Sequence, residues 1–316
     1  MVRGLDIFCG AGGSSAGARA AGIEMRGGID MDPVATRTYA DNFNSAHVVT
    51  SRLEDINLAA LRRQIGTIDL LLASPECTNH TCAKGSAPRS EESRATAMTV
   101  VEYARTFRPR WLVLENVVHM RPWSRYGELK RELELLGYNI GEQILDSKDY
   151  GVAQSRRRLF IVGDLAGKPA LVNHRRRGRK RSAASILDSD GVWPTTLLRK
   201  PGRAADTLAR ADRAEAVLGE NTPYLIVYYG TDGSGGWQPL VRPLRTITTV
   251  DRFALVTPTD DGPRMRMLQV PELRRAMGFD ADYFLGNGTR RDRIRLLGNG
   301  VCPPVMEAVV STLTAA

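Results

Sequence analysis

Two reactive side chains stand at the ends of apolar runs. Cys77 follows the run 69–73 by a few residues, and Glu115 directly follows the run 111–114. Short apolar runs are typical of buried strands, and ligands of open α/β sheets bind beyond the carboxyl ends of such strands. A cysteine there can act as a nucleophile, and a buried carboxyl group can donate a proton because burial raises its pKa. Both are candidate catalytic residues; a buried structural thiol and an arginine-paired carboxylate are the alternatives.

Polar residues precede a further apolar run, 159–162. In a strand, Gln154, Arg156 and Arg158 would share one face, because side chains alternate along a strand. Such a row on a covered sheet could bind phosphate or the edge of a planar base. A solvated edge strand is the alternative.

A glycine-rich turn follows the first apolar run, 5–8. Gly10 and Gly12 would let the backbone approach a ligand, and the next helix would offer unpaired N–H groups. Asp30 comes about 20 residues later, at the end of the second run, where an acidic residue can hold ribose hydroxyls. Ser15 stands where the dinucleotide pattern has a third glycine. The turn therefore indicates a nucleoside cofactor, either NAD or S-adenosylmethionine, with a plain tight turn as the alternative.

A metal site at Cys77 would have to include His80 and Cys82. Their Cys-x2-His-x-Cys spacing is not a usual zinc pattern, and a fourth ligand would have to come from elsewhere. A zinc deaminase would also need a His-x-Glu motif, which the chain lacks. The sequence therefore predicts no metal.

These candidate residues need elements that position them. Strands are expected at 5–8, 25–29, 69–73, 111–114 and 159–162. Helices are expected at 33–43, 58–65, 92–107 and 126–136. This alternation predicts an α/β fold with a doubly wound, mostly parallel sheet and helices on both faces.

The pattern breaks after residue 163. Residues 164–245 are rich in Gly, Pro and Arg, show weak periodicity and include the basic run 175–181. Regular patterns return from residue 246, with helices expected at 270–277 and from Pro303 to about Leu313. The predicted division is therefore one domain of 1–163 and 246–316, and a smaller, loop-rich domain of 164–245.

Composition limits the class of protein. The 316 residues are 42% hydrophobic and 25% charged, which is ordinary for a soluble globular protein and excludes general disorder. No apolar run approaches the ~20 residues of a membrane span, no signal peptide is predicted, and four cysteines are too few for a disulfide framework. A cytoplasmic protein is expected. The net charge of +9 favours a polyanion partner.

The order and spacing of the motifs resemble the DNA (cytosine-5)-methyltransferase family over residues 4 to 312. The segments that carry the resemblance are Asp-Ile-Phe-Cys-Gly-Ala-Gly-Gly at 6–13, Ser-Pro-Glu-Cys at 74–77, Glu-Asn-Val at 115–117, Gln-Ser-Arg-Arg-Arg at 154–158, Arg-Pro-Leu-Arg-Thr-Ile-Thr at 242–248 and Gly-Asn-Gly-Val at 298–301. The resemblance implies a Rossmann-like methyltransferase domain and makes 164–245 a target-recognition domain.

The resemblance also implies roles for the catalytic candidates. Cys77 would attack C6 of a cytosine that has left the duplex stack, so that C5 can take a methyl group from S-adenosylmethionine. Glu115 would contact the N3 and N4 edge and assist at N3. Arg156 and Arg158 would orient Cys77 and the base, with Arg158 the expected contact to O2.

Binding residues follow from the same resemblance. The expected cofactor contacts are Phe8, Gly10, Gly12, Asp30, Met31, Asp55, Ile56, Asn299, Gly300 and Val301. The expected DNA contacts are Gln154, Lys84, Arg175, Arg176 and Arg177. Residues 78–94 would form a lid over DNA, and the glycine-rich turn 229–236 would approach the bases.

Two residues depart from the family pattern. Glu76 stands where the family usually has Pro, and Thr78 where it often has Gln. The charge of Glu76 should disfavour a thiolate at Cys77. A catalytically silent DNA-binding relative is therefore one alternative, and a tRNA cytosine-5 methyltransferase is another, against which the long variable region argues. Double-stranded DNA is the expected partner, a cognate restriction endonuclease would suit the family, and a monomer is the default.

Overall fold

Seven strands form a sheet in the order β3-β2-β1-β4-β5-β7-β6, in which all pairs are parallel except those of β7. The computed structural model describes residues 1–75, 96–173, 180–229 and 235–315. The strands are β1 (Arg3–Ile7), β2 (Glu24–Asp30), β3 (His47–Thr50), β4 (Leu70–Ala73), β5 (Trp111–Asn116), β6 (Asn139–Asp146) and β7 (Arg157–Asp164). The predicted α/β fold with a mostly parallel sheet is confirmed.

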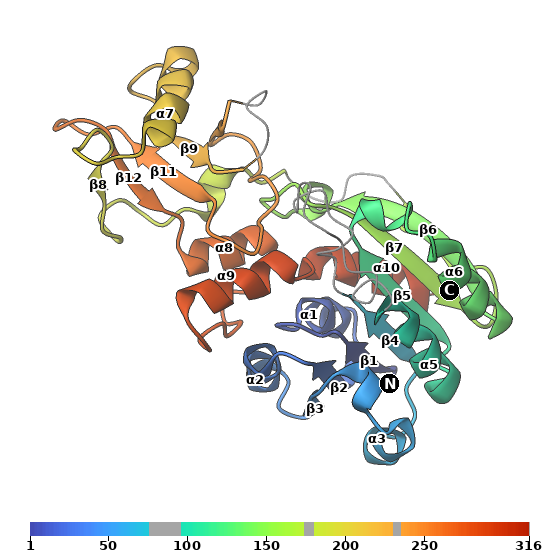
Figure 1. The fold of residues 1–316 in the computed structure, drawn as a ribbon. Helices are drawn as coiled ribbons and strands as arrows, with labels where there is room; N and C mark the ends of the chain where they lie inside the picture. The colour runs from blue at the N-terminus through green and yellow to red at the C-terminus, as the bar shows by residue number, and fades with distance from the viewer. Residues whose placement is uncertain (76–95, 174–179, 230–234, 316) are drawn as a thin grey trace.

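Helices cover both faces of this sheet (Figure 1). One face carries α1 (Gly13–Ala20), α2 (Pro33–Asn42) and α10 (Pro303–Thr314), and the other carries α3 (Leu58–Ile65), α5 (Thr99–Phe107) and α6 (Tyr126–Leu135). Strand β4 is continuously apolar because both of its faces are buried. Leu70 and Leu72 pack on the first face of the sheet, and Leu71 and Ala73 pack on the second. Both layers of the core therefore depend on this central strand.

Two strands of the sheet were not predicted. β3 has four half-exposed or exposed residues, and β6 is an edge strand whose sequence mixes polar and apolar residues. Neither carries the apolar run that marks a buried strand. The predicted helix 92–107 begins at Thr99 in the part of the chain that the structure describes, after a short 3-10 turn, η3 (Thr96–Met98).

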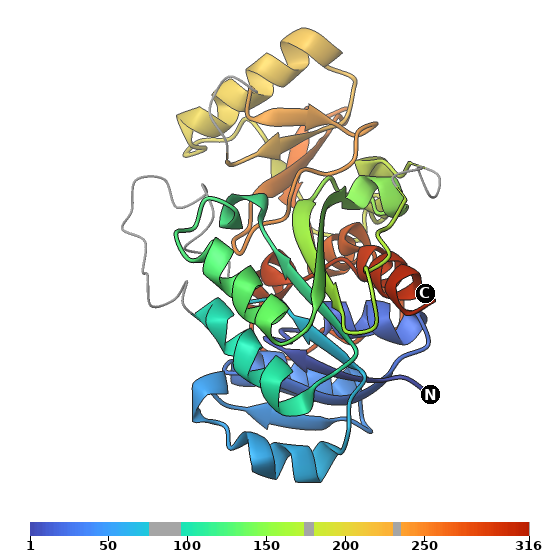
Figure 2. The ribbon, with the colours of Figure 1, turned by 90° about the vertical axis from the view of Figure 1, so that its right-hand side faces the viewer.

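A second, antiparallel sheet lies in a separate lobe, above the first in Figure 2. Its order is β10-β9-β11-β12-β8, and helix α7 (Ala205–Leu218) packs on one face. The strands are β8 (Thr196–Leu197), β9 (Tyr224–Val227), β10 (Trp237–Pro239), β11 (Phe253–Thr257) and β12 (Arg264–Met267). The lobe is less loop-rich than expected. Its helix α7 was not predicted because the side chains that it buries, Thr207, Ala211 and Ala214, are too small and polar to form a strong apolar stripe.

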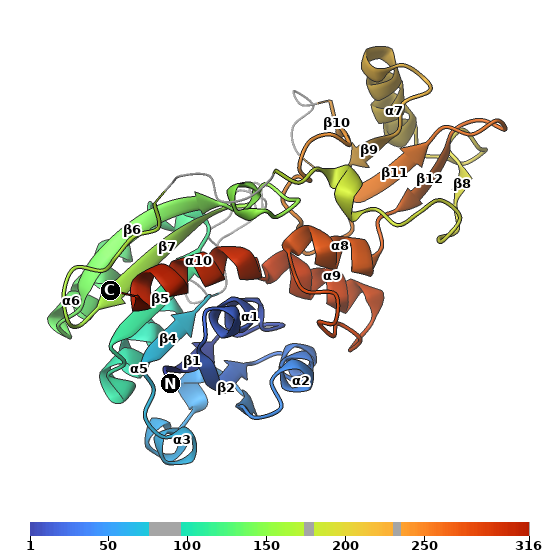
Figure 3. The same cartoon turned by 180° about the vertical axis from the view of Figure 1, so that it is seen from behind.

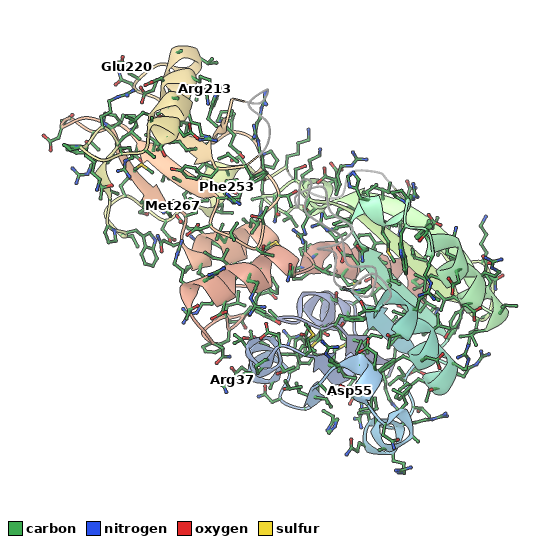
Figure 4. The ribbon with its side chains drawn as sticks, in the orientation of Figure 1. Arg37, Asp55, Arg213, Glu220, Phe253 and Met267 are labelled. Atoms are coloured by element: carbon green, nitrogen blue, oxygen red, sulfur yellow. The ribbon has the colours of Figure 1, made fainter. Side chains whose placement is uncertain are left out.

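Two strands of the second sheet lie beyond the predicted boundary at residue 245. Strands β11 and β12 lie beyond that boundary, yet they pair with β9 and β8 of the second sheet. Phe253 and Met267, labelled in Figure 4, mark the ends of these two strands nearest α8 (Val270–Met277). The second sheet therefore extends to residue 267, because its central strand is supplied by the segment that returns toward the first domain.

The last helices complete the first domain. α9 (Arg290–Asn299) and α10 follow α8, and α10 lies beside α1, as the view from behind shows (Figure 3). The stretch Arg290–Thr314 is long and apolar enough to cross a membrane by length and composition alone, but 67% of its most apolar window is buried. It is therefore a core element of the domain.

The start of α1 leaves no space for a side chain at Gly13. A Cβ atom there would lie 2.2 Å from the backbone oxygen of Val301. We expect Gly13→Ala to lower the free energy of unfolding by about 1–3 kcal/mol, because the backbone must move. Gly127→Ala is the matched control: Gly127 lies in α6 with nothing within 4 Å of its Cβ position, so about 0.5–1 kcal/mol of stabilisation is expected. Urea unfolding of both variants measures these changes. Equal free energies of unfolding for Gly13→Ala and Gly127→Ala would contradict the clash at Gly13.

Candidate active site and cofactor cavity

A cavity of about 530 Å³ lies at the carboxyl ends of β1, β2, β4 and β5. Its wall carries Gly10 and Asp30 at one end and Glu115 and Arg158 at the other. Residues of the last chain segment, including Leu296 and Asn299, close it. The edge of the sheet where ligands of open α/β folds bind is therefore hollow, and one chamber joins the two groups of candidate residues.

The glycine turn is fixed to the end of β2 by one carboxylate. Asp30 Oδ2 accepts a hydrogen bond from the Gly10 N–H at 2.9 Å, and Oδ1 accepts one from the Asp32 N–H at 2.9 Å. Burial raises the pKa of Asp30, and these hydrogen bonds act against that rise. Gly10 has φ +52° and nothing within 4 Å of its Cβ position, so a side chain there would enter the cavity. The turn is built for close approach of a ligand to the backbone.

Helix α9 is fastened to this end of the cavity by an ion pair. Arg295 Nη1 lies 2.6 Å from Asp32 Oδ2, and Asp32 also caps α2 by accepting the Val34 N–H. The sequence does not point to Arg295 or the neighbouring Leu296 as site residues, because no local pattern predicts a helix at α9. The ion pair closes the cavity with residues from the far end of the chain.

Glu115 lies at the other end, as the next-to-last residue of the buried strand β5. Arg158 Nε is 3.2 Å from its Oε1 atom, and both side chains are mostly buried. Burial raises the pKa of Glu115, and the nearby charges of Arg158 and Arg156 act in the opposite direction. The carboxyl group is thus held where it can keep a proton to higher pH than an exposed glutamate. The predicted placement of Glu115 at the end of a buried strand is confirmed.

Arg156 and Gln154 join chain segments to one another. The Arg156 guanidinium donates to Ile247 O at 3.1 Å and to Gly298 O at 2.8 Å, although the residue also lines the cavity. Gln154 is completely buried, accepts the Ile247 N–H at 2.8 Å and donates to Ala276 O at 3.3 Å. The prediction that Gln154 contacts DNA is therefore wrong: its side chain is saturated inside the molecule.

The segment leading to Cys77 is held from two sides. Asn116 Nδ2 donates to Pro75 O at 3.1 Å, and the hydroxyl groups of Ser74 and Ser14 are 3.2 Å apart. Cys77 itself lies outside the described residues, as do Lys84 and Arg175, Arg176 and Arg177. Ser74 and Pro75, the last described residues before Cys77, line the cavity.

The predicted cofactor residues fall into two groups. Phe8, Gly10, Asp30, Met31 and Asn299 line the cavity. Gly12, Asp55, Ile56, Gly300 and Val301 are not part of that lining, and their contact with a cofactor stays a prediction.

The surroundings of three of these residues explain why they are not in the lining. Gly12 packs against Tyr283 and Phe43, and the Val301 carbonyl packs against Gly13. Asp55, labelled in Figure 4, is exposed on the turn η1 (Leu53–Asp55), whose residues Leu53 and Glu54 face the cavity instead. The cavity lining at this turn lies one or two residues before Asp55, because a short 3-10 turn has no pattern in the sequence that fixes its rotation.

The only metal candidates from the sequence, His80 and Cys82 with Cys77, lie outside the described residues. Within the described ranges, the side chains form no group of three His, Cys, Asp or Glu that could hold a metal ion.

Below the glycine turn, Asp6 is completely buried. Its Oδ2 accepts the Ser15 hydroxyl at 2.7 Å, and desolvation raises its pKa from 3.8 to about 7. Between these two values the folded chain binds more protons than the unfolded chain, so stability falls as pH rises toward 7 and is lowest above it. We expect the wild type to be more stable at pH 5.5 than at pH 8, and Asp6→Asn to remove most of that difference, on the order of a few kcal/mol.

Urea unfolding of both proteins at both pH values measures this difference. Glu24→Gln, at a half-exposed position on β2, is the control that should keep the wild-type pH dependence. A wild type whose unfolding free energy does not fall between the two pH values relative to Asp6→Asn would contradict a raised pKa at Asp6.

Comparison with known proteins assigns the family. The sequence model of the C-5 cytosine-specific DNA methylase family matches residues 2–315. The chain is 29% identical over 213 residues to the Type II methyltransferase M.AgeI of Thalassovita gelatinovora, covering 63% of this chain and 49% of the relative. It is 26% identical to M.NaeI of Lentzea aerocolonigenes, covering 99% of this chain and 74% of the relative. The chain thus spans about half the length of M.AgeI and three quarters of M.NaeI.

Solved structures with the same fold include a putative DNA modification methyltransferase encoded in an E. coli prophage, with TM-score 0.72 and 18% identity over 100% of this chain and 99% of that one. Spodoptera frugiperda DNMT2 also has TM-score 0.72, with 15% identity over 99% of this chain and 100% of that one. These likenesses support the fold alone. The family match covers nearly the whole chain, and the protein therefore belongs to the C-5 cytosine-specific DNA methylase family.

Proposed function

We propose that this protein transfers a methyl group from S-adenosylmethionine to C5 of cytosine within a specific duplex DNA sequence. The observation that carries the proposal is the single chamber that joins the Gly10–Asp30 turn to Glu115 and Arg158. S-adenosylmethionine is the methyl donor of the family. A cofactor at one end of the chamber and a base at the other would share one cavity.

The residues at the turn fit an adenosine-containing cofactor. Gly10 leaves its Cβ position open to the cavity, and the apolar side chains of Phe8, Met31 and Leu296 line it. Asp30 presents a carboxylate fixed by two backbone N–H groups, which suits ribose hydroxyls. When bound, S-adenosylmethionine supplies an electrophilic methyl group on a sulfonium sulfur.

The protein residues would act on the base. Cys77 would attack C6 of the flipped cytosine, and Glu115 would hold a proton at N3, so that C5 becomes nucleophilic. Arg158 would hold Glu115 in place through its ion pair and approach the base edge. Arg156 would act indirectly, because its guanidinium fastens the segments that carry Ile247 and Gly298.

The second lobe would read the DNA sequence. We propose that residues from about 165 to 267 form the target-recognition unit, since β11 and β12 complete its sheet. The basic residues near 175–181 would contact phosphates, which position the protein without specifying sequence. A monomer acting on DNA in the cytoplasm, beside a cognate restriction endonuclease, would fit the relatives that are named Type II methyltransferases.

Transfer of tritium from labelled S-adenosylmethionine tests the proposal. Mixed-sequence duplex DNA, single-stranded DNA and tRNA are compared with the same enzyme, and methylated cytosines are then mapped. Label confined to duplex DNA at one sequence is expected. Label in tRNA alone would assign the RNA substrate, and cofactor binding without label in any nucleic acid would assign a silent DNA-binding relative.

A further inference from the structure

A small recess lies behind Glu115, at the inner end of the active-site cavity. It has a volume of about 10 Å³ and lies between β5, β7, the turn η5 (Ser147–Tyr150) and the start of α10. Glu115, Ser147, Cys302 and Val305 are in its wall. A space of this size accommodates one water molecule when two or more polar groups face it.

The Glu115 carboxylate needs a donor in this recess. Glu115 is 5% exposed, and its Oε1 atom has no hydrogen-bond partner among the described residues. Arg158 Nε lies 3.2 Å from Oε1, close enough for an ion pair but not aligned as a hydrogen bond. A buried carboxylate oxygen without a donor costs roughly 1–3 kcal/mol or more, so a further donor is strongly favoured.

Helix α10 begins beside the recess but supplies no donor to it. Pro303 and Pro304 occupy its first turn and have no N–H group. The next two N–H groups, those of Val305 and Met306, both donate to Cys302 O, at 3.1 Å and 3.3 Å. The backbone that would otherwise pair with a carboxylate at a helix N-terminus is therefore unable to do so.

Ser147 and Cys302 are the uncharged polar side chains in the wall, beside the guanidinium groups of Arg156 and Arg158. The Ser147 hydroxyl donates to Gln154 O at 2.6 Å, so its oxygen can accept a hydrogen bond from another donor. Burial raises the pKa of the Cys302 thiol to about 11, so the thiol stays protonated, and it donates weakly to Met277 Sδ at 4.0 Å. The oxygens of Glu115 and Ser147, which can accept hydrogen bonds, and the guanidinium groups of Arg156 and Arg158 thus surround the recess together with the Cys302 thiol.

We propose that this recess is a binding site for one water molecule, which donates one hydrogen bond to Glu115 Oε1 and the other to Ser147 Oγ. The water stabilises the charged carboxylate and so partly offsets the effect of burial. The charged and titratable groups that face Glu115 are Arg158 and Arg156, from β7 and the segment before it, and Cys302 from α10. The inference rests on the proposed function only for the role of Glu115 at the base.

The test fills the recess with one extra methylene group. Val305→Ile adds it at the recess wall, and Val309→Ile adds it one turn further along α10, at a buried position outside the wall. High-resolution crystal structures should show solvent within about 3.2 Å of Glu115 Oε1 and Ser147 Oγ in the wild type and Val309→Ile, but not in Val305→Ile. A wild-type structure without solvent there would overturn the proposal.

The carboxyl band of Glu115 gives a second readout. Infrared difference spectra against Glu115→Gln isolate this band, and it should titrate at about tenfold lower proton concentration in Val305→Ile than in the wild type. An unchanged titration in a folded Val305→Ile protein would overturn the proposal. If Val305→Ile does not fold, Val305→Ala should retain the solvent in a wider recess, and its absence there would also count against the site.

Neither readout depends on methyl transfer. Solvent in the recess without label in any nucleic acid would contradict the proposed function and leave the water site intact. Methyl transfer by an enzyme without solvent in the recess would contradict the water site and leave the proposed function intact.

Discussion

Cys77→Ala is expected to abolish methyl transfer and the covalent complex with DNA that contains 5-fluorocytosine. A thiol at C6 is the group that makes C5 nucleophilic in the proposed reaction, and no other side chain can replace a covalent nucleophile. The loss should exceed about a thousandfold in the rate of tritium transfer. Binding of S-adenosylmethionine, measured by calorimetry, should change little.

Cys82→Ala is the matched control, because Cys82 lies only five residues further along the chain. It should keep both transfer and trapping. Residual trapping by Cys77→Ala would reject Cys77 as the nucleophile, whereas loss of activity in both variants would revive a metal role for the pair. Absence of trapping in the wild type, with cofactor still bound, would indicate that Glu76 disables the thiol.

Glu115→Gln should lower the rate of methyl transfer by about 10²- to 10⁴-fold, the usual contribution of a positioned acid or base. The amide has nearly the same shape and can still face Arg158, but it cannot give up a proton. A larger effect on kcat than on the KM for DNA is expected. Because burial raises the pKa of Glu115, the wild type should retain the protonated acid to higher pH than an ordinary glutamate would.

Single-turnover rates from pH 5 to 9 measure both effects. Glu134→Gln, at an exposed position on α6, should match the wild type throughout. A Glu115→Gln variant with wild-type kcat would show that the carboxyl group does not exchange a proton with the base. A variant with altered DNA affinity alone would assign Glu115 to binding.

The sequence predicted those parts of the site that are local in the chain. Glu115 and Asp30 end buried strands, and runs of apolar residues locate such strands reliably. Gln154 was misassigned for the opposite reason: its partners Ile247 and Ala276 are far away in sequence, and only the fold brings them together. Arg295 could not be predicted for the same reason, because its role depends on an ion pair with Asp32, which is far away in the sequence.

The same reasoning explains the domain boundary. Only their pairing assigns β11 and β12 to the second sheet, because the apolar run of β11 would fit either sheet. Strand order is a property of the whole fold, and one sequence does not encode it in a local pattern.

The position of α10 has a consequence for biosynthesis. This helix packs on α1, and Leu296 and Asn299 just before it wall the cavity that begins at Gly10. The ribosome makes the glycine turn before it makes the helices that cover it. A nascent chain would therefore expose an open, incomplete chamber until α9 and α10 leave the exit tunnel. Cofactor capture would be confined to chains in which both helices have emerged and folded.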